Sequence, residues 1–117
     1  MADVLALVDD LFFQSKLSET ARHVGVALQT VSSGDALVGA AAAATPRLVV
    51  VDLNARQGPL EGIERLRAAG NPAPVIAFLS HVQTEFADRA RAAGCEQVLP
   101  RSQFTANLAA ILSQAKP

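Results

Sequence analysis

Residues 48–54, which read LVVVDLN, constrain the fold of this chain more than any other stretch. Three consecutive β-branched valines favour an extended strand. A run that is apolar on both faces indicates a strand in the middle of a sheet that is covered on both sides. The run ends in a carboxylate, Asp52. Parallel α/β sheets place their functional groups just beyond the carboxyl ends of the strands, so Asp52 is a candidate site residue.

The rest of the chain alternates between strand-like and helix-like segments. Strands are predicted at 4–8, 26–31, 48–52, 75–79 and 96–99, and helices at 11–24, 35–44, 60–69, 83–93 and from Ser102 onward, with Ser102 as the cap of the closing helix. Such alternation with short links predicts a parallel five-stranded sheet with helices on both faces. The whole chain, residues 1–117, is expected to form one domain.

Composition excludes several classes of function. The net charge is −1 and the chain has no Trp or Tyr, which argues against a surface for nucleic acid. A single cysteine, Cys95, favours a reducing compartment. The sequence shows neither a leader pattern nor an apolar run long enough to span a bilayer. A soluble, cytoplasmic protein without membrane contact is expected.

Polar and charged residues follow four of the five predicted strands. Asp9 and Asp10 follow the first, Asp52 ends the third, Ser80 follows the fourth and Arg101 lies just beyond the fifth. If the first and third strands are neighbours, three carboxylates share one crevice, and such a cluster favours a bound cation such as Mg²⁺. A hydroxyl and a fixed cation opposite would complete a pocket for a phosphoryl group. A carboxylate can accept that group as a nucleophile.

This ordered set of residues resembles the receiver domain of bacterial response regulators, the family of chemotaxis-protein-Y-like proteins. The resemblance covers essentially the whole chain and rests on the acidic pair, the central Asp, the hydroxyl and the basic residue at successive strand ends. It implies a flavodoxin-like (βα)5 fold, a three-layer sandwich with strand order 2-1-3-4-5, in which the first and fifth helices share a face.

The resemblance also implies a role for each site residue. Asp52 is expected to be the phosphoacceptor, Ser80 to hydrogen-bond the phosphoryl group, and Arg101 to supply the positive charge. Mg²⁺ is expected on Asp9, Asp10, Asp52 and the backbone carbonyl of Asn54. The implied partners are a sensor histidine kinase or phosphotransfer protein, a downstream protein target, and a second copy through the fourth helix, fifth strand and fifth helix.

Three departures from the family pattern leave an alternative open. Arg101 stands where the family has lysine, and it either replaces that lysine or clamps Asp52 and blocks phosphorylation. Val98 replaces a frequent aromatic residue, and His81 stands beside Ser80 where a small residue is usual. The alternative is a pseudo-receiver that acts as a protein-interaction module without phosphorylation.

Simpler interpretations of the same residues also exist. Asp9 and Asp10 could serve only as helix caps, because Asp is favoured there. Cys95 is interpreted as a small buried hydrophobe. A dehalogenase-type phosphohydrolase would need an Asp-x-Asp spacing, and a nucleotide-binding domain would need a glycine-rich first turn. No turnover enzyme is expected, beyond gain and loss of the phosphoryl group on Asp52.

Overall fold

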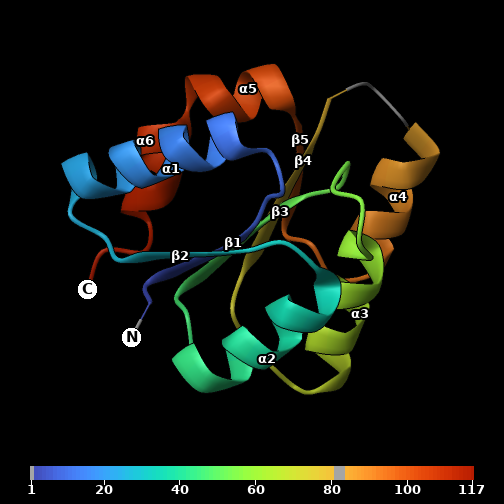
Figure 1. Ribbon diagram of the computed structural model, residues 1–117. Coiled ribbons are helices and arrows are strands. Elements are labelled where there is room, and N and C mark those ends of the chain that lie inside the picture. The colour runs from blue at the N-terminus through green and yellow to red at the C-terminus, as the bar shows by residue number, and fades with distance from the viewer. Residues whose placement is uncertain (1, 81–83) are drawn as a thin grey trace.

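The structure is a computed structural model that describes residues 2–80 and 84–117. Strands and helices alternate along the chain (Figure 1). The strands are β1 (Val4–Leu7), β2 (Leu28–Val31), β3 (Leu48–Asp52), β4 (Val75–Leu79) and β5 (Gln97–Pro100). The helices are α1 (Leu11–Val24), α2 (Gly34–Ala44), α3 (Pro59–Ala68), α4 (Thr84–Ala92), α5 (Arg101–Ala106) and α6 (Leu108–Ser113).

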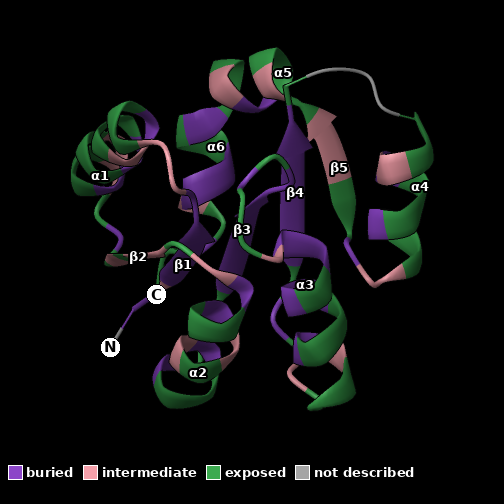
Figure 2. Ribbon diagram, turned by 45° about the vertical axis from the view of Figure 1, so that its right-hand side comes forward, coloured by how far each residue is buried: buried purple, intermediate pink, exposed green. Residues whose placement is uncertain are grey.

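The five strands form one parallel sheet in the order β2-β1-β3-β4-β5, as predicted. Strand β3 lies at the centre, and every one of its residues is buried (Figure 2). Asp52, its last residue, is in register with Phe78 of β4. The register places both side chains on the same face of the sheet, at its carboxyl edge.

Helices cover both faces of the sheet, with α1, α5 and α6 on one side and α2, α3 and α4 on the other (Figure 1). Each interface has its own cluster of buried side chains. The cluster under α1 contains three phenylalanine rings, and the ring centroids of Phe78 and Phe104 are 4.4 Å apart. Phe13 of α1 completes this group, with its centroid 5.2 Å from that of Phe78.

The predicted helix ends are confirmed at two caps and wrong at the closing helix. Asp10 caps α1 and Ser33 caps α2 through their side chains. The closing helix begins at Arg101 rather than after Ser102, with Pro100 at the cap position. It also breaks into α5 and α6 at Asn107, whose φ and ψ are −110° and 16°. The apolar stripe that predicted one helix continues across the break, because Phe104 and Leu108 both stay buried.

Other boundaries shift by one or two residues. Strand β2 begins at Leu28 instead of residue 26, and β5 runs one residue later than predicted. Cys95 is buried as expected, and burial raises the pKa of its thiol to about 11. In the part of the chain that is described, no helix has the length and apolar character needed to cross a membrane.

Arg67, near the end of α3, ties three segments together at the edge of the sheet opposite Asp52. Its guanidinium donates to the carbonyls of Asn71, Ala73 and Gly94, and its Nη2 lies 2.8 Å from Oε1 of Glu96. The side chain is only 23% exposed. These bonds join the end of α3 to the starts of β4 and β5.

Replacing Arg67 with methionine is expected to lower the free energy of unfolding by about 2 kcal/mol, because three carbonyls lose a donor and the Glu96 carboxylate keeps only the N–H of Val75. Urea unfolding followed by far-UV circular dichroism measures this. Arg65→Met is the matched control on the same helix, since Arg65 pairs with an exposed carboxylate, Asp35, and should cost less than about 1 kcal/mol. Equal losses in the two variants would contradict the role given to Arg67.

Candidate functional site

The candidate site lies at the carboxyl edge of the sheet, where the sequence placed it. Asp52 is only 3% exposed, although an aspartate side chain in water carries a negative charge at neutral pH. Its Oδ1 accepts a hydrogen bond of 2.8 Å from the backbone N–H of Asn54, in the turn that follows β3. The strand ends here because this turn redirects the chain toward α3.

The electrostatics of Asp52 reflect both its burial and its charged neighbours. Burial raises the pKa of Asp52 above its ordinary value, and the negative charges of Asp9 and Asp10 raise it further. The hydrogen bond from Asn54 and the positive charge of Arg101 act in the opposite direction on the same pKa. The predicted meeting of the acidic pair, Asp52 and Arg101 at one edge is therefore present in the fold.

Asp10 has partners for both of its carboxylate oxygens. Oδ1 accepts hydrogen bonds from the backbone N–H groups of Phe12 and Phe13, at 2.9 and 3.2 Å. Oδ2 lies 3.1 Å from Nη2 of Arg101. The hydrogen bond from Phe13, with the help of Arg101, holds the pKa of Asp10 below its ordinary value. The cap interpretation of Asp10 is thus confirmed, and its carboxylate lies beside Arg101 at the carboxyl edge of the sheet.

Asp9 and Asn54 connect the site to neighbouring loops. Oδ2 of Asp9 accepts a 3.0 Å hydrogen bond from the backbone N–H of Arg56, in the loop after β3. Oδ1 of Asn54 accepts a hydrogen bond from the backbone N–H of Ser80, the exposed residue that follows β4. These contacts join the ends of β1, β3 and β4 in one framework. His81, which was predicted to stand at the entrance, lies outside the described residues.

Arg101 makes its ion pair with Asp10, whereas the sequence left open whether it clamps Asp52 or replaces the family's lysine. Its guanidinium carbon lies 4.4 Å from the centroid of Phe13 and 5.8 Å from that of Phe78. The cation therefore rests on the aromatic group beneath α1. The apolar pattern of the sequence indicates only core positions for Phe13 and Phe78. Their positions in the sequence carried no signal for a second role, because both rings are distant from Arg101 along the chain and meet it only in the folded structure.

The donors at this edge have the right chemistry for Mg²⁺, because carboxylate and carbonyl oxygens are its usual protein ligands. An oxygen of Asp9, an oxygen of Asp52 and both oxygens of Asp10 already accept hydrogen bonds, so a cation would have to share these oxygens or displace their donors. Within residues 2–80 and 84–117, no group of three or more His, Cys, Asp or Glu side chains is placed to hold a metal ion.

Solved structures share this architecture. The chain superposes on chemotaxis protein CheY4 of Vibrio cholerae with a TM-score of 0.85, at 20% identity and with 99% of each chain covered. The chain has the fold of a receiver domain.

Two further structures with the receiver fold support this result. The receiver domain of the sensor histidine kinase PA1611 from Pseudomonas aeruginosa, which has a magnesium ion in its active-site cleft, gives a TM-score of 0.83 at 20% identity over 97% of this chain and 95% of that one. The receiver domain of NtrX from Brucella abortus gives 0.78 at 18% identity, over 97% and 100% of the two chains. No protein-family model and no curated protein sequence matches the chain.

Proposed function

We propose that this chain is a response-regulator receiver module of a phosphorelay, in which Asp52 accepts a phosphoryl group. One observation carries the proposal. A buried carboxylate ends the central strand of a receiver fold, within electrostatic range of an acidic pair and a guanidinium. A charged side chain that is 3% exposed is rare unless it has a function or a partner that offsets its charge.

The chemistry follows from the carboxylate. Oδ1 of Asp52 is held by the N–H of Asn54, so we assign the attack on phosphorus to Oδ2. The new oxygen–phosphorus bond forms as the bond from phosphorus to the donor breaks, and the donor keeps that electron pair. The positive charge of Arg101 offsets charge on the phosphoryl oxygens, and the hydroxyl of Ser80 is assigned a hydrogen bond to one of them.

Magnesium remains a prediction for this site. Asp9, Asp10, Asp52 and the backbone carbonyl of Asn54 are the residues that would hold it, and the ion would supply charge compensation to the phosphoryl oxygens. No turnover reaction is proposed beyond gain and loss of the phosphoryl group. The output is assigned to contacts with other proteins, including a second copy through α4, β5 and α5.

The proposal is tested by phosphoryl uptake. The full chain is incubated with acetyl phosphate, with and without MgCl₂, and its intact mass is measured. A single added phosphoryl group that peptide mapping places on Asp52 supports the proposal. If no adduct forms in either condition, the phosphorylation-independent pseudo-receiver is favoured instead. Two observations support this second candidate: Arg101 is paired with Asp10, and Asp52 is buried.

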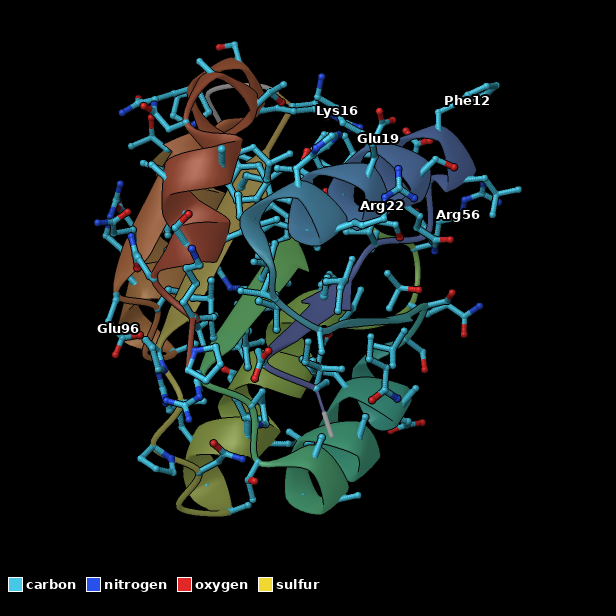
Figure 3. All side chains as sticks on the ribbon, turned by 90° about the vertical axis from the view of Figure 1, so that its left-hand side faces the viewer. Phe12, Lys16, Glu19, Arg22, Arg56 and Glu96 are labelled. Atoms are coloured by element: carbon cyan, nitrogen blue, oxygen red, sulfur yellow. The ribbon has the colours of Figure 1, made fainter. Side chains whose placement is uncertain are left out.

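An exposed apolar surface lies next to the site. Leu11 and Phe12, at the first turn of α1, are 75% and 90% exposed. Figure 3 shows Phe12 extending into solvent, with Arg56 projecting at the same end of the molecule. An exposed aromatic side chain beside the acceptor suits a protein donor, because aromatic residues often dominate binding energy at interfaces. We assign this surface to the protein that carries the phosphohistidine.

Phe12→Ser is expected to slow transfer from a phosphohistidine protein about tenfold, because an interface aromatic contributes on this scale. Uptake from acetyl phosphate should not change, since a small donor needs no docking surface. The free energy of unfolding should stay within about 0.5 kcal/mol of the wild type, because Phe12 is 90% exposed. Slower uptake from acetyl phosphate would instead assign Phe12 to the structure of the site.

A further inference from the structure

Arg101 is held by an ion pair at the edge of its guanidinium group and by an aromatic ring at its face. Nη2 reaches Oδ2 of Asp10 at 3.1 Å, and the guanidinium carbon lies 4.4 Å from the centroid of the Phe13 ring. Phe13 is one of the two residues whose backbone N–H groups Asp10 caps, so the start of α1 supplies both the anion and the ring. Because Arg101 begins α5, directly after β5, the side chain bridges the two helices above the carboxyl edge of the sheet.

The hydrogen-bond partners of the Asp10 carboxylate limit what else it can bind. Oδ1 is occupied by the first turn of α1, and Oδ2 by Arg101. A divalent cation that used this carboxylate would have to displace either the helix cap or the guanidinium. The cap consists of two backbone hydrogen bonds at the start of a 14-residue helix, so the guanidinium is the partner that can leave.

We infer that the guanidinium of Arg101 competes with divalent metal ions for the Asp10 carboxylate. Its contact with the Phe13 ring stabilises the ion pair against this displacement. This deepens the proposed function and rests on it for the assignment of the site. A flat guanidinium stacks on an aromatic face more favourably than an ammonium group does, and it is less strongly hydrated. The arginine at this position therefore makes the site less receptive to Mg²⁺ than lysine would.

The experiment measures binding of MgCl₂ alone by isothermal titration calorimetry, without any phosphodonor. Arg101→Lys keeps the charge and loses the flat contact with the ring, and Phe13→Leu keeps Arg101 and removes the ring. Both variants are expected to bind Mg²⁺ about tenfold more tightly than the wild type. Phe104→Leu is the matched control, because Phe104 packs against Phe13 and Phe78 in the same aromatic cluster, whereas the guanidinium of Arg101 lies over the other two rings. It should bind Mg²⁺ as the wild type does.

The Arg101→Ala variant distinguishes direct competition for the Asp10 carboxylate from a long-range effect of the positive charge of Arg101. If only this variant gains affinity, and both charge-conserving variants match the wild type, the effect is a long-range charge effect and the inference is overturned. Equal gains in Phe13→Leu and Phe104→Leu would also overturn it, because they would trace the effect to a loosened core. Far-UV circular dichroism shows whether each variant is folded, and Arg101→Lys tests the inference even if Phe13→Leu does not fold.

Failure of this inference can be told apart from failure of the proposed function. Metal affinity is measured on the unmodified chain, whereas phosphoryl uptake is measured as an added mass on Asp52. A chain that accepts the phosphoryl group, and whose Mg²⁺ affinity is unaffected by the charge-conserving variants, would refute the competition alone. A chain that shows the competition and takes up no phosphoryl group would refute the proposed function alone.

Discussion

Asp52→Asn is expected to abolish phosphoryl uptake and, at neutral pH, to raise the melting temperature. The amide is not a nucleophile toward phosphorus, so no adduct should form with acetyl phosphate. Its oxygen can still accept the hydrogen bond that Asn54 donates to the carboxylate at 2.8 Å. The variant therefore keeps the turn after β3 and avoids burying a charge in a position that is 3% exposed.

The pH dependence of this gain has a definite sign. Because burial raises the pKa of Asp52 in the folded protein above its ordinary value of 3.8, the folded state holds that proton more tightly than the unfolded state does. Stability contributed by the protonated form is fully present below pH 3.8 and is lost as the pH rises through the raised pKa. The melting temperatures of wild type and variant should thus converge in acid and separate toward neutral pH.

Thermal unfolding followed by circular dichroism across this range measures the separation, and intact mass measures uptake. Asp35→Asn is the matched control, because the Asp35 side chain is 87% exposed and its charge is solvated. It should keep uptake and change stability by less than about 1 kcal/mol at any pH. An adduct that still forms on Asp52→Asn would show that another residue is the acceptor.

Gly34→Ala is expected to lower the free energy of unfolding by about 3 kcal/mol, the upper part of the range for overpacked sites. A Cβ atom on Gly34 would lie 2.2 Å from the carbonyl oxygen of Gly58, which is backbone and cannot rotate away. Gly34 also donates its N–H to the carbonyl of Gln57 at 2.8 Å. The start of α2 therefore rests directly on the loop that leads from Asp52 to α3.

Gly39→Ala, on the same helix, is the matched control. A Cβ atom there meets nothing within 4 Å. Alanine is the better helix former, so this variant should gain about 0.5–1 kcal/mol. Urea unfolding by far-UV circular dichroism suits both variants, since the chain has no Trp or Tyr to serve as a fluorescent probe. A gain in both would mean that the contact between Gly34 and Gly58 relaxes without cost.

The convergence of the site residues could be predicted because it depends only on topology. Asp52 ends a strand, whereas Asp10, Ser80 and Arg101 each follow one, and the carboxyl ends of parallel strands share one edge of the sheet. The three valines before Asp52 were enough to indicate that its strand is central. Each of these patterns is local, because it involves only a few neighbouring residues in the sequence.

The pairing of those residues could not be predicted in the same way. The sequence left open whether Arg101 clamps Asp52 or replaces the family's lysine; in the structure the ion pair forms with Asp10, and the guanidinium rests on Phe13. The break at Asn107 was also missed, because the apolar stripe that identifies a helix continues through it.

What the sequence determined by itself is the order of strands and helices, the buried central strand, and the edge at which charged groups meet. The tertiary structure decided which oxygen each donor reaches, that a glycine-to-glycine contact seats α2 against the loop after Asp52, and that two aromatic rings support Arg101. The physical reason is the separation along the chain over which each interaction acts. Periodicity and β-branching act through the backbone over a few residues. An ion pair between Asp10 and Arg101 depends on side-chain lengths and on the packing of helices that are far apart in the chain.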